Sequence, residues 1–124
     1  MAARILIVDD DEHFGRNAAE FLGLHGFNCL FSGRPVEGLA AAREFMPELA
    51  VIDFEMPELD GAGLAAGLLG IPGLGGLPLI CLTAFPEGAA DRLAAVCPSC
   101  LVLDKTDGLT GLLSAVNGIL GTEK

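Results

Sequence analysis

Short apolar runs alternate with amphipathic segments along the whole chain. Five runs are mostly apolar, and most of them are rich in leucine or β-branched residues, as in strands buried on both faces of a parallel sheet. We expect these strands at residues 3–8, 27–31, 49–53, 79–82 and 101–103. The segments that follow them carry apolar residues at helical spacing. We expect helices at residues 12–24, 62–69, 86–96 and 109–120, and one more that a cap at Ser32 begins and that ends at about residue 45. The pattern therefore predicts a strand followed by a helix, five times.

The second helix has identifiable start and stop signals. We expect Ser32 to cap it, because a serine hydroxyl accepts hydrogen bonds from the free amides of the first turn. Pro47 ends it, since proline cannot continue a helix. The residues that we expect to face the core are Val36, Leu39, Ala40 and Phe45.

Alternating strands and helices favour one architecture. Parallel strands joined by helices require right-handed crossovers, which place helices on both faces of the sheet. We therefore predict a three-layer, doubly wound α/β sandwich with five parallel strands, formed by residues 1–124 as a single domain.

Charge limits the partners of such a domain. Asp and Glu number 17 against 7 Lys and Arg, for a formal net charge of −10, which repels nucleic acids and anionic membranes. Residues 61–86 carry no charge and are long enough to span a bilayer, but glycines and prolines break them near the middle. The first apolar run is short and ends in acids, so we expect no signal peptide and a cytoplasmic protein.

Four cysteines raise the question of redox or metal chemistry. Cys97 and Cys100 have the spacing of a redox or zinc pair. The pair enters a strand instead of opening a helix, however, and no second pair of ligands accompanies it. We expect free thiols.

Polar residues stand at the end of four of the five predicted strands or within two positions after it. Strand carboxyl ends in this architecture converge on one pocket, and their side chains there should lie together. The residues concerned are Asp9 and Asp10 after the first strand, Asp53 at the end of the third, Thr83 after the fourth and Lys105 after the fifth. Asp53 is the centre of this cluster, because the Pro57 and Gly61 that follow turn the chain away from the sheet.

These residues, with their neighbours, resemble the receiver domains of bacterial two-component response regulators over essentially the whole length. The matching motifs are Ile5-Leu6-Ile7-Val8-Asp9-Asp10, Val51-Ile52-Asp53 with Met56-Pro57 and Asp60-Gly61, Leu82-Thr83-Ala84, and Leu101-Val102-Leu103-Asp104-Lys105. The resemblance implies the flavodoxin-like strand order 2-1-3-4-5. It also implies a signalling switch in a phosphorelay, not an enzyme beyond its own phosphorylation and dephosphorylation. The implied partners are a histidine kinase or phosphotransfer protein and a downstream protein or effector domain.

The resemblance assigns a role to each site residue. Asp53 is the implied phosphoacceptor, Lys105 neutralises the phosphoryl oxygens, and Thr83 reports the change through its hydroxyl. Clustered carboxylates repel one another, which a small hard cation relieves. We expect Mg²⁺, held by Asp10, Asp53 and the backbone carbonyl of Glu55, and indirectly by Asp9.

Two positions depart from the family pattern. Val102 stands where relatives commonly have an aromatic residue that moves with the threonine, and Thr106 stands where they have proline after a peptide bond that is often cis. Both favour an alternative, a receiver-like interaction module that works without phosphorylation. A phosphatase of the haloacid-dehalogenase type fits poorly, because Glu55 replaces its second aspartate and the nucleophile lies on the third strand.

Overall fold

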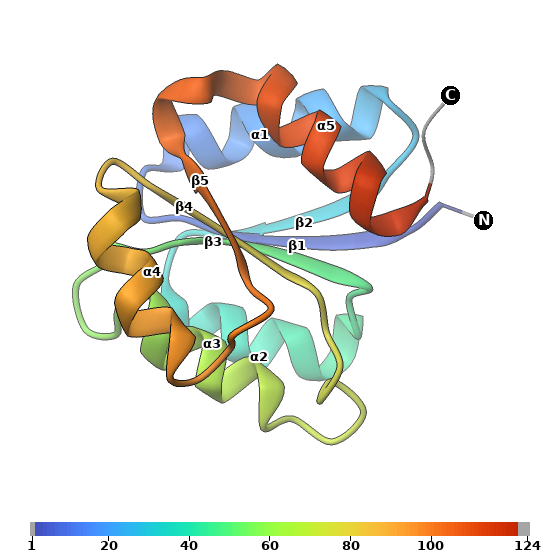
Figure 1. The fold of residues 1–124 in the computed structure, drawn as a ribbon. Helices are drawn as coiled ribbons and strands as arrows, with labels where there is room; N and C mark the ends of the chain where they lie inside the picture. Colours follow the sequence, from blue (N-terminus) through green and yellow to red (C-terminus); the bar gives the residue numbers. More distant parts are fainter. Residues whose placement is uncertain (1, 122–124) are drawn as a thin grey trace.

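The computed structural model describes residues 2–121; residue 1 and residues 122–124 of the predicted single domain lie outside this range. The elements are β1 (Arg4–Val8), α1 (Glu12–Leu24), β2 (Asn28–Ser32), α2 (Pro35–Phe45), β3 (Leu49–Asp53), α3 (Gly61–Leu69), β4 (Leu79–Thr83), α4 (Pro86–Ala94), β5 (Leu101–Asp104), a 3-10 turn η1 (Lys105–Asp107) and α5 (Gly108–Leu120). The strands form one parallel sheet in the order β2-β1-β3-β4-β5 (Figure 1). The predicted fold class and strand order are confirmed.

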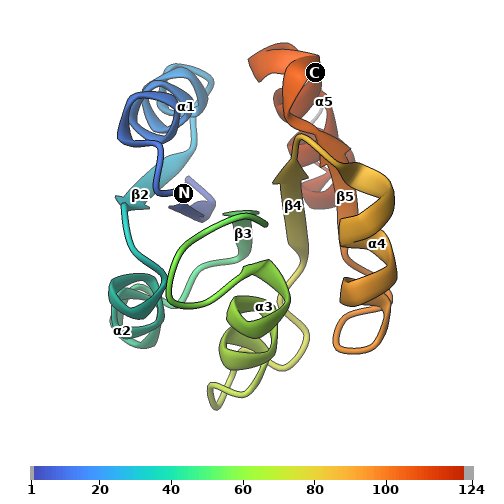
Figure 2. The same ribbon diagram turned by 90° about the vertical axis from the view of Figure 1, so that its left-hand side faces the viewer.

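The sheet separates two hydrophobic layers. Helices α1 and α5 cover one face, and α2, α3 and α4 cover the other (Figures 1 and 2). Side chains alternate between the layers along each strand, so that Ile5 and Ile7 pack under α1 and α5 while Leu6 and Val8 face α2 and α3. All residues of β3 and β4 are buried. The sheet therefore holds the ends of these two strands rigidly.

Strand register brings the predicted polar residues to one edge of the sheet. Val8 pairs with Ile52, so Asp9 lies beside Asp53. On the other side of β3, Asp53 pairs with Leu82, which places Thr83 one step further along. Because all strands run in parallel, their carboxyl ends open toward the same side.

Helix α2 begins later than the sequence predicted. Ser32 is the last residue of β2, and its hydroxyl donates a hydrogen bond to the carbonyl oxygen of Arg34 at 3.1 Å. The helix starts at Pro35, and the Arg34 side chain makes no capping hydrogen bond. The prediction that Ser32 caps α2 was wrong because a proline fits the first helical position without a side-chain cap.

The inward face of α2 also differs from the prediction. Val36 is 60% exposed and Ala40 is exposed, whereas Gly38 and Ala42 are buried and Leu39 and Phe45 are partly buried. A Cβ atom on Gly38 would lie 2.7 Å from the side chain of Val8. The helix therefore approaches β1 through its glycine, and this contact turns Val36 and Ala40 toward solvent.

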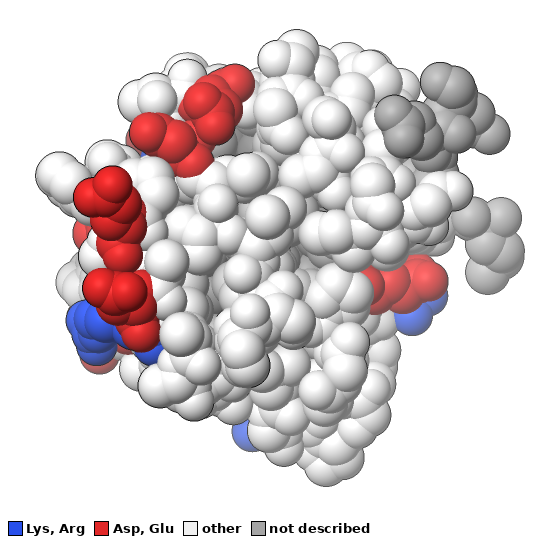
Figure 3. Space-filling model, viewed as in Figure 1, with Lys and Arg blue, Asp and Glu red and all other residues white. Residues whose placement is uncertain are grey.

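The remaining helices follow the prediction closely. Helix α4 ends at Ala94, two residues before the predicted end at Val96, and Val96 is 39% exposed. No helix within residues 2–121 is both long and apolar enough to cross a bilayer. On the face shown in Figure 3, acidic side chains gather over α4 and around the turn from β5 into α5, whereas the surface along α5 itself is uncharged.

Candidate functional site

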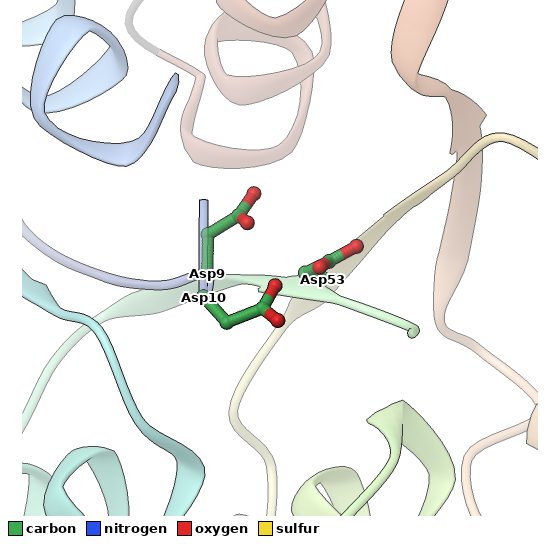
Figure 4. Close-up of side chains that lie close together, drawn as sticks. All are labelled: Asp9, Asp10 and Asp53. Atoms are coloured by element: carbon green, nitrogen blue, oxygen red, sulfur yellow. The ribbon is translucent and has the colours of Figure 1, made fainter. Parts of the chain in front are cut away.

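Three aspartates lie together where β1 and β3 end (Figure 4). One carboxylate oxygen from each of Asp9, Asp10 and Asp53 lies within 4.8 Å of the others. Asp9 and Asp53 are 2% and 5% exposed, whereas Asp10 is exposed. Among the described residues this is the only group of three or more potential metal-ligating side chains. Closely spaced hard oxygen donors of this kind fit a cation such as Mg²⁺.

Lys105 brings a positive charge into the aspartate cluster. Its Nζ atom lies 2.9 Å from Asp9 Oδ2 and 3.8 Å from Asp53 Oδ1. The ammonium group also lies 4.7 Å from the ring centre of Phe14 on α1, an attractive cation–π contact. Burial lowers the pKa of Lys105, but the hydrogen bond to Asp9 and the charges of Asp9 and Asp53 raise it overall. Lys105 is therefore held charged within reach of Asp53.

The electrostatics of the cluster oppose ionisation of Asp53. Burial is the largest cause and the charge of Asp9 the next; together they raise the pKa of Asp53 to about 8, against the opposing charge of Lys105. Burial also raises the pKa of Asp9, although Lys105 acts against it. An anion is costly in such a site unless a cation accompanies it, so the site itself favours a bound cation.

Thr83 lies at the end of β4 with its side chain fully buried. Its hydroxyl donates a hydrogen bond to Glu55 Oε2 at 2.8 Å and accepts one from the backbone N–H of Phe85 at 3.0 Å. The sequence assigned Glu55 a role only through its backbone carbonyl, so the side-chain contact was missed. The adjacency of β3 and β4 was the available signal, since it brings the residues after Asp53 close to Thr83.

Two ion pairs hold the loop between β3 and α3. Asp60 caps α3 by accepting a hydrogen bond from the Gly63 amide, and its carboxylate contacts Arg92 of α4 at 2.5 Å. The Arg92 guanidinium also lies 5.5 Å from the ring centre of Phe54. On the other side of the loop, Glu58 pairs with Arg34 at 2.6 Å. Arg92 thus links α4 directly to the segment that follows Asp53, a contact that the sequence did not reveal.

The two positions that depart from the family pattern lie in β5 and η1, on either side of Lys105 along the chain. Val102 is partly buried and packs against the layer of α2, α3 and α4. Thr106 lies in η1, where its amide and hydroxyl both donate to Asp104 Oδ1. All described peptide bonds are trans, including the one before Thr106.

The cysteine pair precedes β5, at the opposite end of this strand from Lys105. Cys97 is buried and Cys100 is partly buried, and both are free thiols in the structure. Burial, with a smaller contribution from Cys97, raises the pKa of Cys100 to about 12. The Cys100 thiol is therefore a poor nucleophile at neutral pH.

Comparisons with known proteins agree with the geometry. The profile of the response regulator receiver domain matches residues 5–110. The DNA-binding response regulator MtrA of Mycolicibacterium paratuberculosis is 32% identical over 84 residues, which are 68% of this chain and 36% of MtrA. A protein-glutamate methylesterase/protein-glutamine glutaminase of Rhodospirillum rubrum is 37% identical over 59 residues, 47% of this chain and 16% of that protein. The chain thus spans well under half the length of these relatives.

Solved structures show the same fold. The chemotaxis protein CheY4 of Vibrio cholerae superposes with a TM-score of 0.87 at 22% identity, over 94% of this chain and 98% of that one. The receiver domain of a signal transduction histidine kinase from Syntrophus aciditrophicus gives a TM-score of 0.84 at 27% identity, over 99% and 93%.

Proposed function

Because this chain belongs to the response regulator receiver domain family, we propose that it is a phosphorylatable receiver of a two-component phosphorelay with Asp53 as the phosphoacceptor. The observation that carries the proposal is the position of Asp53, buried at the end of β3 beside two other aspartates and one lysine. Such a carboxylate is a fixed nucleophile with a positive charge nearby. Among residues 2–121, only Asp53 combines a place in a central strand with neighbouring aspartates and a nearby lysine.

The transfer step forms one bond and breaks another. A carboxylate oxygen of Asp53 attacks the phosphorus of a phosphohistidine, the P–N bond breaks, and the imidazole leaves with the electron pair. Lys105 lies 3.8 Å from Asp53 and donates to a phosphoryl oxygen as negative charge moves onto the acceptor. The burial that raises the Asp53 pKa also excludes bulk water from the nucleophile.

The donor set supports a magnesium site. Asp10 and Asp53 would hold the ion through their side chains and Glu55 through its backbone carbonyl, with Asp9 acting indirectly. The bound ion would neutralise phosphoryl oxygens and reduce the repulsion among the carboxylates. Asp9 meanwhile orients Lys105 through their 2.9 Å ion pair.

Phosphorylation is read out by Thr83. A phosphoryl oxygen on Asp53 offers a strong acceptor for the Thr83 hydroxyl, and the hydroxyl carries the Phe85 amide with it. The loop between β4 and α4 therefore shifts with the phosphorylation state. The proposed partners are a histidine kinase or phosphotransfer protein upstream and a protein or effector domain downstream. We propose a cytoplasmic location, one domain over residues 1–124, and no enzymatic activity toward other substrates.

Phosphorylation is testable with a small phosphodonor. The protein incubated with Mg²⁺ and acetyl phosphate should gain one phosphoryl group by intact mass, in a hydroxylamine-labile linkage. Asp53→Asn should abolish the gain, and Asp91→Asn, which removes an exposed aspartate of α4, should keep it. Uptake by the Asp53→Asn protein would refute the assignment of the acceptor. No uptake by the parent would favour the interaction module, to which Val102 and Thr106 point.

A further inference from the structure

The hydroxyl of Thr83 is fully engaged in the unphosphorylated protein. A threonine hydroxyl has one proton to donate, and Thr83 gives it to the carboxylate of Glu55. The same oxygen accepts the amide of Phe85, which fixes its orientation. A new acceptor can receive the proton only after the bond to Glu55 breaks.

We propose that the Glu55 side chain is a positioning group that holds the Thr83 hydroxyl in the resting state and competes with the phosphoryl group for it. The inference rests on the proposed function, because it concerns the state that Thr83 leaves on phosphorylation. Glu55 thereby sets how readily phosphorylation converts into movement of the loop that begins at Phe85.

The surroundings of Glu55 suit a bond that forms and breaks. The carboxylate is a charged acceptor, and hydrogen bonds to charged acceptors are stronger than those between neutral groups. Glu55 is nevertheless exposed, so water replaces Thr83 when the carboxylate is released. A phosphoryl group on Asp53, two residues earlier, adds like charge next to Glu55 and favours this release.

The side chain of Glu55 also acts separately from its backbone. The proposed contribution to the metal site comes from the backbone carbonyl, which every substitution at this position retains. Glu58 offers a matched control in the same loop, because its carboxylate pairs with Arg34 and makes no contact with Thr83. Glu58→Gln therefore removes a negative charge from the loop alone, whereas Glu55→Ala removes a charge together with the hydrogen bond to Thr83.

A double-mutant cycle measures the competition directly. Beryllofluoride affinity in the presence of Mg²⁺ is compared for the parent, Glu55→Ala, Thr83→Ala and the double variant. Glu55→Ala should bind about tenfold more tightly than the parent, because Thr83 is released and one negative charge is lost. In the Thr83→Ala background the same substitution should gain only about twofold, from charge alone. Glu58→Gln should also change affinity by no more than about twofold.

A second measurement reports the position of the hydroxyl without any ligand. In Glu55→Ala the Phe85 amide resonance should move toward its position in the beryllofluoride complex, whereas Glu58→Gln should leave it unchanged.

The outcomes separate this inference from the proposed function. Equal gains from Glu55→Ala in both Thr83 backgrounds would show that the bond does not compete with the phosphoryl group and would overturn the inference alone. A parent protein that binds no beryllofluoride and accepts no phosphoryl group would overturn the proposed function, and this inference with it.

Discussion

Replacing Asp53 by asparagine should stabilise the metal-free protein in a pH-dependent way. Asp53 is 5% exposed, and its pKa rises from 3.8 to about 8 on folding. Between these values the folded protein keeps a proton that the unfolded chain releases, so the stability of the parent falls as the pH rises from about 4 to about 8. Asparagine does not ionise, so the Asp53→Asn protein does not lose this stability as the pH rises.

The size of the effect follows from the same pKa. A pH of 7 is about 3 units above 3.8, the pKa of Asp53 in the unfolded chain. Each unit corresponds to about 1.4 kcal/mol of folding free energy. The upper limit is therefore about 4 kcal/mol, and burying the asparagine amide reduces it to about 2 to 4 kcal/mol. For a chain of 124 residues this corresponds to a melting temperature about 10 °C higher. At pH 5 the gain should shrink to about 1 kcal/mol.

Thermal unfolding followed by circular dichroism in EDTA at pH 5 and pH 7 measures this difference. Asp91→Asn is the matched control, because it removes the same charge from an exposed position on α4 and should change stability by no more than about 0.5 kcal/mol. Adding Mg²⁺ should raise the melting temperature of the parent more than that of Asp53→Asn. An Asp53→Asn protein that gains as much at pH 5 as at pH 7, or is less stable than the parent at pH 7, would refute the reasoning.

Three further substitutions or titrations test neighbouring parts of the site. Asp10→Asn should weaken Mg²⁺ binding in a calorimetric titration. It should also raise the stability of the metal-free protein, by less than about 1 kcal/mol because Asp10 is exposed, and a variant less stable than the parent would count against a clustered carboxylate site. Arg92→Gln removes the ion pair with Asp60, so beryllofluoride should perturb fewer α4 amides than in the parent, and an unchanged number would exclude this route of coupling. Beryllofluoride should shift amides around Val102 less than those after Asp53 and Thr83, because valine has no ring to move inward, and large shifts throughout β5 would contradict this.

The fold was predictable because burial leaves a strong pattern in the sequence. The run that ends in Val51, Ile52 and Asp53 predicts a strand covered on both faces, and all residues of β3 are buried in the structure. Once five such runs alternate with helices, the parallel sheet follows, and its strand ends collect the polar residues. As expected from the sequence, these residues lie together: Lys105 Nζ is within 4 Å of a carboxylate oxygen of both Asp9 and Asp53.

Other features depend on contacts that no local pattern encodes. Ser32 is a good helix cap by residue type, but β2 extends through it to pair with Val8. The orientation of α2 depends on the close approach of Gly38 to β1, which helical periodicity does not contain. The bond between Glu55 and Thr83 joins side chains 28 residues apart, and it depends on a side-chain rotamer as well as on strand order.

The site takes its residues from nearly the full length of the chain, from Asp9 after β1 to Lys105 after β5. A chain emerging from the ribosome carries Asp53, the proposed acceptor, long before it carries Lys105, and β4 must pair on both sides before Lys105 reaches the aspartates. The cluster is therefore complete only when the whole sheet has formed. A truncated or half-folded chain lacks the full set of aspartates and lysine on which the proposed phosphorylation depends.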